Sequence, residues 1–406
     1  MAIRIGVCGA GAFAQQFIPL FKAHPRVSEV LVADILPDRA SATAEKFGIK
    51  RPLSSLDDLC RSDLDAIALF TQRQLHGPQA VQALRAGKHV YSAVPMGQTL
   101  EEVRAIVQAV EQTRLVYMTG ETSYYYPAAV YCRDRFRKGD FGAFVYGEGQ
   151  YLHDMSHFYQ SFMRSGGADW KKVAGIPPMH YPTHSSSMVL SVTGARATQV
   201  SCMGYVDNHE DAIFRRGANH WDNIFSNESA LMRTSDGGML RINEFRRVGW
   251  KGMSSVQTSI FGTKGCYEEQ ANAQAWVTVD PKQTEDLTNL LRASESHGGK
   301  PAADVNPEVW KEFHMNTAKV HKTGRLPKEL KGLPNGHAGS HQFLVDDFVK
   351  AVAANRLPPN NVWDSARYLV PGLVAHQSAV AGGRLMYIPD LGSPAKHWAM
   401  LDPDVE

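Results

Sequence analysis

The sequence lacks the features that mark several large classes of protein. Its five cysteines are widely scattered and form no CxxC pair, which argues against a disulfide framework and against a zinc site. We expect them to be reduced and mostly buried: Cys8, Cys60, Cys132, Cys202 and Cys266. No apolar run approaches the roughly 20 residues of a membrane-spanning helix, and no leader precedes the first strand pattern. These absences predict a soluble, cytoplasmic protein.

An excess of charge of one sign is also missing. Lys and Arg number 43 against 41 Asp and Glu, the formal net charge is +2, and no long basic run occurs. Nucleic-acid and membrane partners are therefore not expected. What is present is an ordinary globular composition, 43% hydrophobic and 21% charged, and the length of 406 residues predicts two domains.

Residues 3–24 predict a dinucleotide-binding turn. They place an apolar run, a glycine-rich turn and a helical pattern in that order (IRIGVCGAGAFAQQFIPLFKAH). Gly9, Gly11 and Ala14 fit G-x-G-x-x-A, in which the first glycine allows the tight turn, the second admits a pyrophosphate and the small third residue lets helix pack on strand. The helix N-terminus would then face the phosphates. The predicted cofactor-binding residues here are Gly9, Gly11, Ala12 and Phe13.

A second apolar run, SEVLVADIL, supports this interpretation. It contains Asp34, 25 residues after Gly9, near the spacing of a ribose-binding carboxylate. A carboxylate there hydrogen-bonds a free 2′-hydroxyl and repels a 2′-phosphate, so the predicted cofactor is NAD rather than NADP. The alternative is that Asp34 only begins a turn.

Strand and helix patterns then alternate to about residue 120. Such alternation predicts a Rossmann-type α/β domain, a doubly wound parallel sheet with helices on both faces, which binds ligands at the carboxyl ends of its strands. We therefore expect further cofactor contacts at the ends of the later strands. The predicted residues are Thr71, Ala93, Pro95 and Glu121.

Beyond about residue 124 the pattern changes. Several strand patterns separated by turn signals predict an antiparallel sheet, and a helix over residues 342–354 is expected to pack back on it. We therefore divide the chain into an NAD-binding domain over residues 1–123 and a substrate-binding and oligomerisation α+β domain over residues 124–406. Residues 270–335 are polar and weakly periodic, which predicts an insertion that covers the site or contacts a partner subunit.

Four segments spread along the chain carry a family resemblance: GAGAFA at 9–14, FTQRQLH at 70–76, AGKHVYSAVP at 86–95 and VDDFVKAVAANRLPP at 345–359. With these, nearly the whole chain resembles the glucose-fructose oxidoreductase, inositol dehydrogenase and rhizopine catabolism (Gfo/Idh/MocA) family. The resemblance implies a Rossmann domain that binds NAD, with His76 on the cofactor rim. It also implies a second domain with an open, mostly antiparallel sheet, a carbohydrate substrate, and assembly into a homo-oligomer, a dimer or tetramer.

One segment departs from the family pattern. Dehydrogenases of the family usually have an EKP lysine that helps to move the substrate's hydroxyl proton, whereas this chain has Ala93, Val94 and Pro95. Val94 cannot carry a proton. Where those enzymes often show an Asp and a His four apart, this chain has His180 and His184, so the resemblance implies that His184 handles the proton.

The segment Tyr181-Pro182-Thr183-His184 resembles relatives of this fold that are NAD-dependent glycosidases, of the α-N-acetylgalactosaminidase type. Further parallels are Glu121, Tyr125, His153, Asp154, Trp170 and His337. Such enzymes oxidise a ring hydroxyl, usually at C3, so that the C2 proton becomes acidic; the aglycone leaves, water adds and the hydride returns. They do not need the carboxylate pair of ordinary glycosidases. A glutamate at position 93 and an upstream arginine of those glycosidases are absent here, which implies another sugar, with a sulfoquinovoside as one candidate.

The predicted catalytic residues are His184, Tyr181 and Tyr125. Imidazole titrates near neutrality, so His184 is the predicted acceptor of the hydroxyl proton. Tyr181 or Tyr125 would act as the C2 base if a nearby cation or the charge of the nicotinamide lowers the pKa of its phenol. Because Pro182 disfavours helix at Tyr181, we expect a loop that presents both side chains.

Substrate contacts are predicted at His180, His153, Asp154, Trp170, Lys171, Lys172, Arg246 and His337. The cations among them, together with Arg247, would bind an anionic sugar through their N–H groups, the alternative being that they are only solvated. His153 and Asp154 would otherwise form a pair that supports the site. A metal site built on His153, Asp154 and His157 is the rival use of these histidines, but Pro182 breaks the helical spacing of the next pair and no cysteine pair is present, so none is predicted.

Three functions therefore remain open. The leading one is an NAD-dependent glycoside hydrolase, and the second is a conventional sugar or polyol dehydrogenase in which His184 alone handles the proton. The third is a sensor or binding protein that holds a dinucleotide without turnover.

Overall fold

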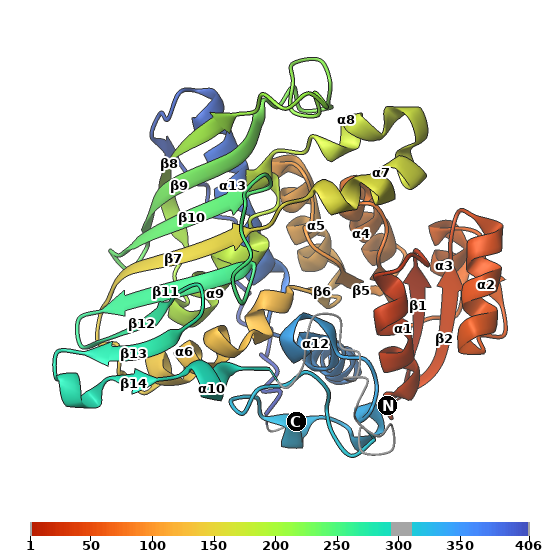
Figure 1. The fold of residues 1–406 in the computed structure, drawn as a ribbon. Coiled ribbons are helices and arrows are strands. Elements are labelled where there is room, and N and C mark those ends of the chain that lie inside the picture. Colours follow the sequence, from red (N-terminus) through yellow and green to blue (C-terminus); the bar gives the residue numbers. More distant parts are fainter. Residues whose placement is uncertain (1, 294–310, 405–406) are drawn as a thin grey trace. The chain divides into compact units, whose positions relative to one another are not determined.

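The computed structural model describes residues 2–293 and 311–404, which divide into two compact units (Figure 1). The first unit comprises Met1–Val130, Leu290–Ala366 and Leu391–Glu406, and the second comprises Tyr131–Asn289 and Arg367–Asp390. The predicted division between residues 123 and 124 treats everything after it as one domain. The structure differs, because the C-terminal part of the chain returns to the N-terminal unit.

Six parallel strands form the sheet of the first unit, as far as the described residues go, in the order β3-β2-β1-β4-β5-β6. Their bounds are β1 Ile3–Cys8, β2 Val27–Ala33, β3 Pro52–Leu53, β4 Ala66–Leu69, β5 His89–Ser92 and β6 Tyr117–Thr119. The residues of β4 are all buried, as expected when helices cover both faces. The strand order reverses at β1, which is the doubly wound arrangement. The predicted fold class is confirmed.

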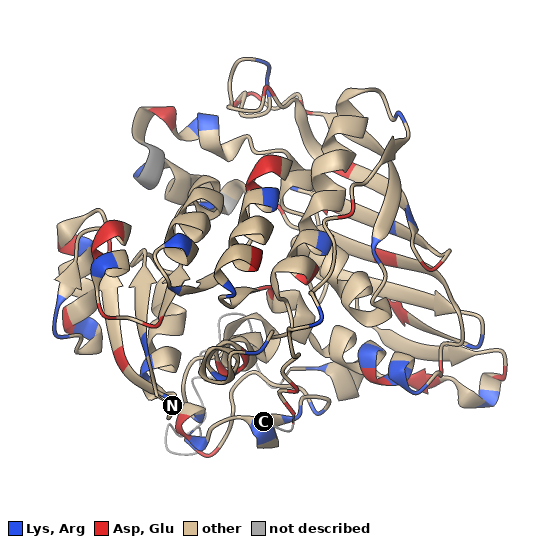
Figure 2. Cartoon of the chain, turned by 180° about the vertical axis from the view of Figure 1, so that it is seen from behind, with Lys and Arg blue, Asp and Glu red and all other residues tan. Residues whose placement is uncertain are grey.

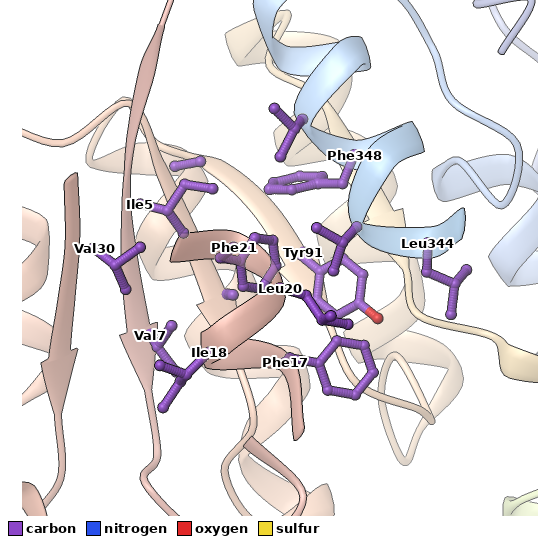
Figure 3. Packing of buried hydrophobic residues seen from close by; sticks show 14 of the residues in the cluster. Ile5, Val7, Phe17, Ile18, Leu20, Phe21, Val30, Tyr91, Leu344 and Phe348 are labelled. Atoms are coloured by element: carbon purple, nitrogen blue, oxygen red, sulfur yellow. The ribbon is translucent and has the colours of Figure 1, made fainter. Parts of the chain in front are cut away.

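Six helices of this unit are α1 Ala14–Ala23, α2 Pro37–Phe47, α3 Leu56–Arg61, α4 His76–Arg85, α5 Leu100–Thr113 and α12 Gly336–Ala354. Helix α12 shares the main core with α1 and the sheet: Tyr91 of β5 lies 5.6 Å from the ring of Phe348 and 6.0 Å from that of Phe21 (Figure 3). The helix predicted at 342–354 therefore exists, but it packs on the parallel sheet. Residues on all sides of α12 are buried, as is typical of a helix that lies inside a core rather than on one face of a sheet.

An ion cluster inside the first unit fixes the segment before α12. Arg325 lies 2.7 Å from Asp346 and 2.8 Å from Asp347, and it donates a hydrogen bond of 3.0 Å to the hydroxyl of Tyr125. Both aspartate side chains are fully buried. Burial raises the pKa of Asp347 to about 6, even though Arg325 opposes this shift. The cluster joins a loop, a long helix and the 3₁₀ helix Thr122–Tyr125.

The prediction for residues 270–335 requires correction, as far as they are described; residues 294–310 lie outside the described residues. Residues 274–286 supply two strands to the second sheet, with Trp276 buried. Met315 and Leu330 are buried in the first unit. The apolar residues of this region are sparse and not periodic, which predicts an insertion. In the structure these few side chains, among them Trp276, Met315 and Leu330, are buried.

Nine strands form the sheet of the second unit, counting the described residues, in the order β14-β13-β12-β11-β7-β10-β9-β8-β15. Neighbours pair antiparallel except β10 and β7, which are parallel. The bounds are β7 Phe144–Leu152, β8 Ala197–Val206, β9 Phe225–Thr234, β10 Met239–Phe245, β11 Val256–Gly262, β12 Gly265–Glu269, β13 Gln274–Thr278, β14 Glu285–Asp286 and β15 Met386–Tyr387. The predicted open, mostly antiparallel sheet is confirmed.

Three helices lie in this unit: α7 Tyr159–Gly166, α8 Trp170–Ala174 and α9 Thr183–Thr193. Three more cross the division between the units: α6 Pro127–Arg137, α10 Thr288–Leu291 and α13 Val362–Val380. Helix α9 lies directly on β7 because glycines face it. A Cβ on Gly149 would overlap the backbone carbonyl of Ser185, and one on Gly147 would come within 2.6 Å of Val189.

The free thiols agree with the sequence-based expectation. Lys and Arg are interspersed with Asp and Glu along the elements of each unit (Figure 2). All five cysteines are free, and Cys8, Cys132 and Cys202 are buried. In the described part of the chain, no helix combines the length and the apolar character that crossing a membrane requires.

We expect Arg325→Met to lower the free energy of unfolding by about 3 to 5 kcal/mol, because it removes the cation beside buried Asp347 and leaves Asp346 paired only with Lys350 and His24. Lys322→Met is the matched control, since the partly exposed pair of Lys322 and Asp404 contributes at most about 1 kcal/mol. Urea unfolding followed by circular dichroism measures both. Equal losses in the two variants would contradict the assigned role of the cluster.

Candidate active site

The glycine-rich turn of the first unit has the geometry that a dinucleotide needs. Gly9 has φ +92°, and a Cβ there would lie 2.7 Å from the carbonyl oxygen of Phe70, so a side chain is excluded by conformation and by space. Around Gly11 a Cβ would meet nothing within 4 Å, which leaves the room that a pyrophosphate requires. Among the described residues no side chain caps the N-terminus of α1. The N–H groups of Gln15 and Gln16 bond the carbonyl oxygens of Gly11 and Phe13, but the helix dipole still favours an anion at this end.

Asp34 lies just after β2, where the ribose-binding carboxylate was predicted. Its carboxylate accepts hydrogen bonds from the backbone N–H of Ala10 at 2.8 Å and of Leu36 at 2.9 Å, and from Arg39 at 2.8 and 2.9 Å. Burial raises the pKa of Asp34, but the hydrogen bonds from Arg39 and the backbone outweigh it, and the net pKa is below its usual value. Asp34 is therefore ionised at neutral pH. Sequence analysis missed Arg39, which shares this site five residues later.

His76 does not serve as predicted. It is buried, with Nδ1 2.8 Å from the carbonyl oxygen of Pro95 and Nε2 3.1 Å from that of Thr71. Both ring nitrogens face backbone oxygens, so the ring joins the loops after β4 and β5 and offers no nitrogen to a cofactor. Ala93 is also buried, and Glu121 is fully buried with Oε1 accepting from the backbone N–H of Ser123.

Tyr125 is not placed to act as a base. Its hydroxyl donates to Asp347 and accepts from Arg325, and its ring stacks on Phe343 at 4.9 Å. Burial and the adjacent Asp347 raise the pKa of Tyr125 well above 10. A phenol that donates to a buried carboxylate holds its proton, so Tyr125 stabilises the first unit and the predicted catalytic role is corrected.

In the second unit, the YPTH segment forms the entry to α9. Residues Pro178–His180 make a 3₁₀ turn, Tyr181 has extended backbone with φ −135°, and Pro182 precedes the helix. The predicted loop is therefore confirmed for Tyr181 but not for His184, which lies in the first turn of α9 and is buried. Proline fits at this position because the first helical turn needs no N–H from it.

We call five side chains the His184 cluster: His184, the rings of Tyr181 and Tyr151 that contact it, and His153 and Arg246, which contact those tyrosines. The rings of Tyr151 and Tyr181 lie 5.3 and 5.2 Å from that of His184, both edge to face. The guanidinium of Arg246 lies 4.5 Å from the ring centre of Tyr151 and 5.9 Å from that of Tyr181. Such cation–π contacts are strongest where water is excluded, and the Arg246 side chain is only 6% exposed.

Tyr151 is the residue of this cluster that sequence analysis missed. Its hydroxyl lies 2.7 Å from Nδ1 of His153, so phenol and imidazole form a hydrogen-bonded pair. The alternation of GEGQY gives the signal that was available: Gly147, Gly149 and Tyr151 share one face of β7. The two glycines make room for α9, and Tyr151 emerges at the end of the strand beside His184.

Glu244 forms an ion pair with Arg246 of the cluster. It is fully buried, and its two oxygens accept from the hydroxyl of Ser185 and from Arg246. Burial raises the pKa of Glu244 to about 7, although Arg246, Ser185 and His184 oppose the rise. The charge of Glu244, which lies beside Arg246 of the cluster, therefore changes near neutral pH.

A second histidine pair lies beside the YPTH segment. His376 of α13 bonds Glu228 of β9 at 2.8 Å through Nδ1, and Glu228 also accepts from the backbone N–H of Met179 at 2.9 Å. The ring of His180 lies 5.1 Å from that of His376. Burial lowers the pKa of His180 to about 3, so this predicted substrate contact is neutral.

Three of the predicted substrate contacts have structural partners instead. Lys171 donates to the carbonyl oxygen of Asp211 at 2.8 Å, Lys172 pairs with Asp169, and Trp170 packs on a small core around Phe214. Two further residues also have partners. Asp154 accepts from the backbone N–H of Ser156, and Arg247 is paired with Asp207 and Asp211. Within the described part of the chain no group of three or more ligand-type side chains could hold a metal, and the side chain of His157 lies outside the described residues.

Comparison with protein families identifies the N-terminal part of the first unit. Residues 3–121 match the model of the Gfo/Idh/MocA oxidoreductase family, which is described as an NAD-binding Rossmann fold. Residues 3–121 therefore form an NAD-binding domain of this family. The predicted family resemblance and the predicted cofactor, NAD, are confirmed, and the chain is an NAD-dependent enzyme.

Relatives extend over nearly the whole chain. A glycosyl hydrolase family 109 protein of Streptomyces filamentosus is 25% identical over 415 residues, covering 96% of this chain and 77% of the relative. One of Porphyromonas gingivalis is 28% identical, covering 96% and 84%. Levoglucosan dehydrogenase, solved with NADH and levoglucosan, superposes with a TM-score of 0.73 at 18% identity, covering 96% of this chain and 100% of that chain. The last comparison shows the fold.

The raised pKa of Glu244 predicts a pH dependence of stability. A carboxyl group whose pKa is higher in the folded protein stabilises it less as pH rises from the unfolded pKa, near 4.5, through the folded pKa, near 7. We expect wild type to lose up to about 3 kcal/mol more than Glu244→Gln between pH 5 and pH 8. Urea midpoints at the two pH values measure the difference. Exposed Glu210→Gln is the control and should follow wild type; a Glu244→Gln variant that also follows wild type would refute the titration.

Proposed function

We propose that this protein is an NAD-dependent glycoside hydrolase that transiently oxidises a ring hydroxyl of a sugar. The observation that carries the proposal is the His184 cluster, in which an imidazole contacts two phenol rings and both rings contact one buried guanidinium. Glycosyl hydrolase family 109 relatives along 96% of the chain support it. The family lysine is absent from its segment, so the proton chemistry must come from other residues.

NAD supplies the hydride chemistry when bound, and Gly9, Gly11 and Asp34 fit it as described above. His184 takes the proton of the oxidised hydroxyl and returns it later, a role that suits an imidazole near neutral pH. A ketone at C3 makes the neighbouring C2 proton acidic, so a second base is required.

We assign the second base to Tyr151 or Tyr181. Both rings contact Arg246, and a cation beside a phenol favours its ionised form and also the negative charge that develops on the sugar. Tyr151 has the further advantage of its hydrogen bond to His153, which gives its proton a place to go. Tyr125 is not a candidate, because its hydroxyl donates to buried Asp347 and holds its proton.

Arg246 is also the residue on which an anionic substrate would depend. Its Nη2 contacts Glu244 and the carbonyl oxygen of Tyr181, whereas its buried Nη1 has no hydrogen-bond partner. A sulfonate or carboxylate oxygen of the substrate, as in a sulfoquinovoside, would satisfy this N–H. Assembly into a homo-oligomer and a cytoplasmic location remain predictions.

A sugar dehydrogenase is the second candidate, favoured by the fold shared with levoglucosan dehydrogenase. The two activities differ in what happens to NADH. A hydrolase of the proposed kind returns the hydride in every cycle, whereas a dehydrogenase accumulates NADH in proportion to product.

The proposed function is tested with neutral and anionic aryl glycosides, by following aglycone release and NADH absorbance together. We expect release that requires catalytic amounts of NAD, no net NADH, and one deuterium at C2 of the product in deuterated water, because the C2 proton is removed and replaced. NADH that accumulates with free sugar would instead establish the dehydrogenase. Absence of both reactions would reject both enzymes.

Variants of the His184 cluster test the assigned roles. His184→Ala should lower kcat at least about 100-fold, because a general base contributes that much. Whichever of Tyr151→Phe and Tyr181→Phe removes the C2 base should abolish deuterium incorporation while the protein still reduces NAD in the first half-reaction. Exposed Tyr205→Phe on β8 is the control and should retain activity. Full activity in His184→Ala would contradict the mechanism.

A further inference from the structure

Two buried carboxylates lie opposite each other in the sheet of the second unit. Glu228 of β9 pairs with Glu244 of β10 in the antiparallel register, and both side chains are fully buried. Residues directly opposite in such a pair lie on one face of the sheet, where like charges repel each other. Burial adds the loss of hydration to this repulsion. The pair is therefore costly, and the donors that each carboxylate binds indicate its role.

Glu228 binds the chain just before the YPTH segment. Its carboxylate accepts a hydrogen bond of 2.9 Å from the backbone N–H of Met179, in the turn Pro178–His180, and lies 2.8 Å from Nδ1 of His376. Met179 is fully buried, so its N–H would be left without an acceptor if this carboxylate were removed. Glu228 therefore fixes the point at which the chain enters Tyr181.

Glu244 binds the chain just after the same segment. One of its oxygens accepts from the hydroxyl of Ser185, and the other accepts from Arg246. The two opposite carboxylates thus hold both ends of residues 179–185, and the pairing of β9 with β10 sets the spacing between them. We call Glu228 and Glu244 the carboxylate clamp.

Helix α13 covers the entry turn. A Cβ at Gly372 would overlap the carbonyl oxygen of Met179 and the ring of Pro182, so the helix backbone lies directly against this segment. His376 lies one helical turn later on the same face of α13 and reaches Glu228. Because an ionised carboxylate only accepts, Nδ1 of His376 carries the proton. The helix thereby limits the space of the turn and supplies the second donor to Glu228.

We infer that Glu228 is a positioning residue of the proposed active site, because the carboxylate clamp sets where Tyr181 and His184 present their rings. The inference rests on the proposed function for its effect on catalysis, whereas the clamp is a property of the second unit alone. Glu228 acts through the clamped segment and does not contact the substrate. What its position requires is an acceptor for the N–H of Met179 rather than a negative charge.

Three variants of the full-length, NAD-loaded protein test the inference in the reaction that the wild type catalyses, aglycone release or NADH formation. Glu228→Met removes the acceptor from Met179, and kcat should fall about 100-fold, because a small misplacement of reacting groups costs that much. Glu228→Gln keeps an acceptor oxygen and should stay within about fivefold of wild type. A kcat of Glu228→Met within this fivefold range, or a loss in Glu228→Gln as large as that in Glu228→Met, overturns the inference.

Glu269→Met is the matched control. Glu269 is a buried carboxylate of β12 that accepts from the backbone N–H of Thr258 at 3.0 Å, so its loss also leaves a backbone N–H of the same sheet without an acceptor. Its kcat per folded protein should equal that of wild type. Equal losses of kcat in Glu269→Met and Glu228→Met would show a general effect of stability and overturn the inference.

Magnetic resonance of protein with ¹⁵N-labelled histidine tests the clamp without any activity. In Glu228→Gln the amide oxygen faces the N–H of Met179, so the amide NH₂ faces Nδ1 of His376 and moves the proton of that ring to Nε2. The ring signals of His184 should stay in place when this proton moves, and should shift when it remains on Nδ1, since Met179 has then lost its acceptor. Either of the other two combinations overturns the inference, whether or not Glu228→Met folds. A wild type without either reaction rejects the proposed function and leaves these signals to decide the inference.

Discussion

The burial of Arg246 beside Glu244 is the constraint on which the proposed site depends. A guanidinium out of water needs a counter-charge and hydrogen bonds, and Glu244 and the backbone of Tyr181 supply part of them. Once the cation is fixed there, the rings of Tyr151 and Tyr181 pack on it, and the ring of His184 contacts both of them. The positions of the proton-handling groups thus follow from one buried charge.

The first unit buries an arginine in a contrasting way. Arg325 has two aspartates and a tyrosine hydroxyl around it, and the cluster closes a loop against α12. Arg246 has one carboxylate, whose pKa of about 7 leaves its charge dependent on pH, and a buried N–H without a partner. The first arrangement is what stability requires. The arrangement around Arg246 leaves one N–H without an acceptor, as expected of a group that meets negative charge during a reaction.

The sequence allowed good prediction wherever a function is local along the chain. The turn at Gly9 and Asp34 after the next strand lie within two neighbouring strands and their turns, so their spacing carried the information. The YPTH segment is also local, but its predicted role came from a family resemblance. Tyr151 and Glu244 are different, because they meet only through the pairing of β7 with β10. That pairing is parallel, with Glu244 opposite Tyr151, in a sheet that turn signals predict to be antiparallel. Register of this kind is decided by tertiary packing, which no local pattern reports.

The predicted residues that failed share a physical reason. Lys171 and His76 have the chemical type of ligand-binding residues, but in the structure their side-chain nitrogens contact backbone oxygens. Residue type alone cannot distinguish a group that binds a ligand from one that binds the chain, because both need the same atoms. What distinguishes them is whether hydrogen bonds within the protein satisfy the polar atoms at each position. At Arg246 a buried N–H has no hydrogen-bond partner, so this position lowers the stability of the free protein. Folding alone does not explain such a position, whereas the proposed binding of a substrate oxygen to this N–H does.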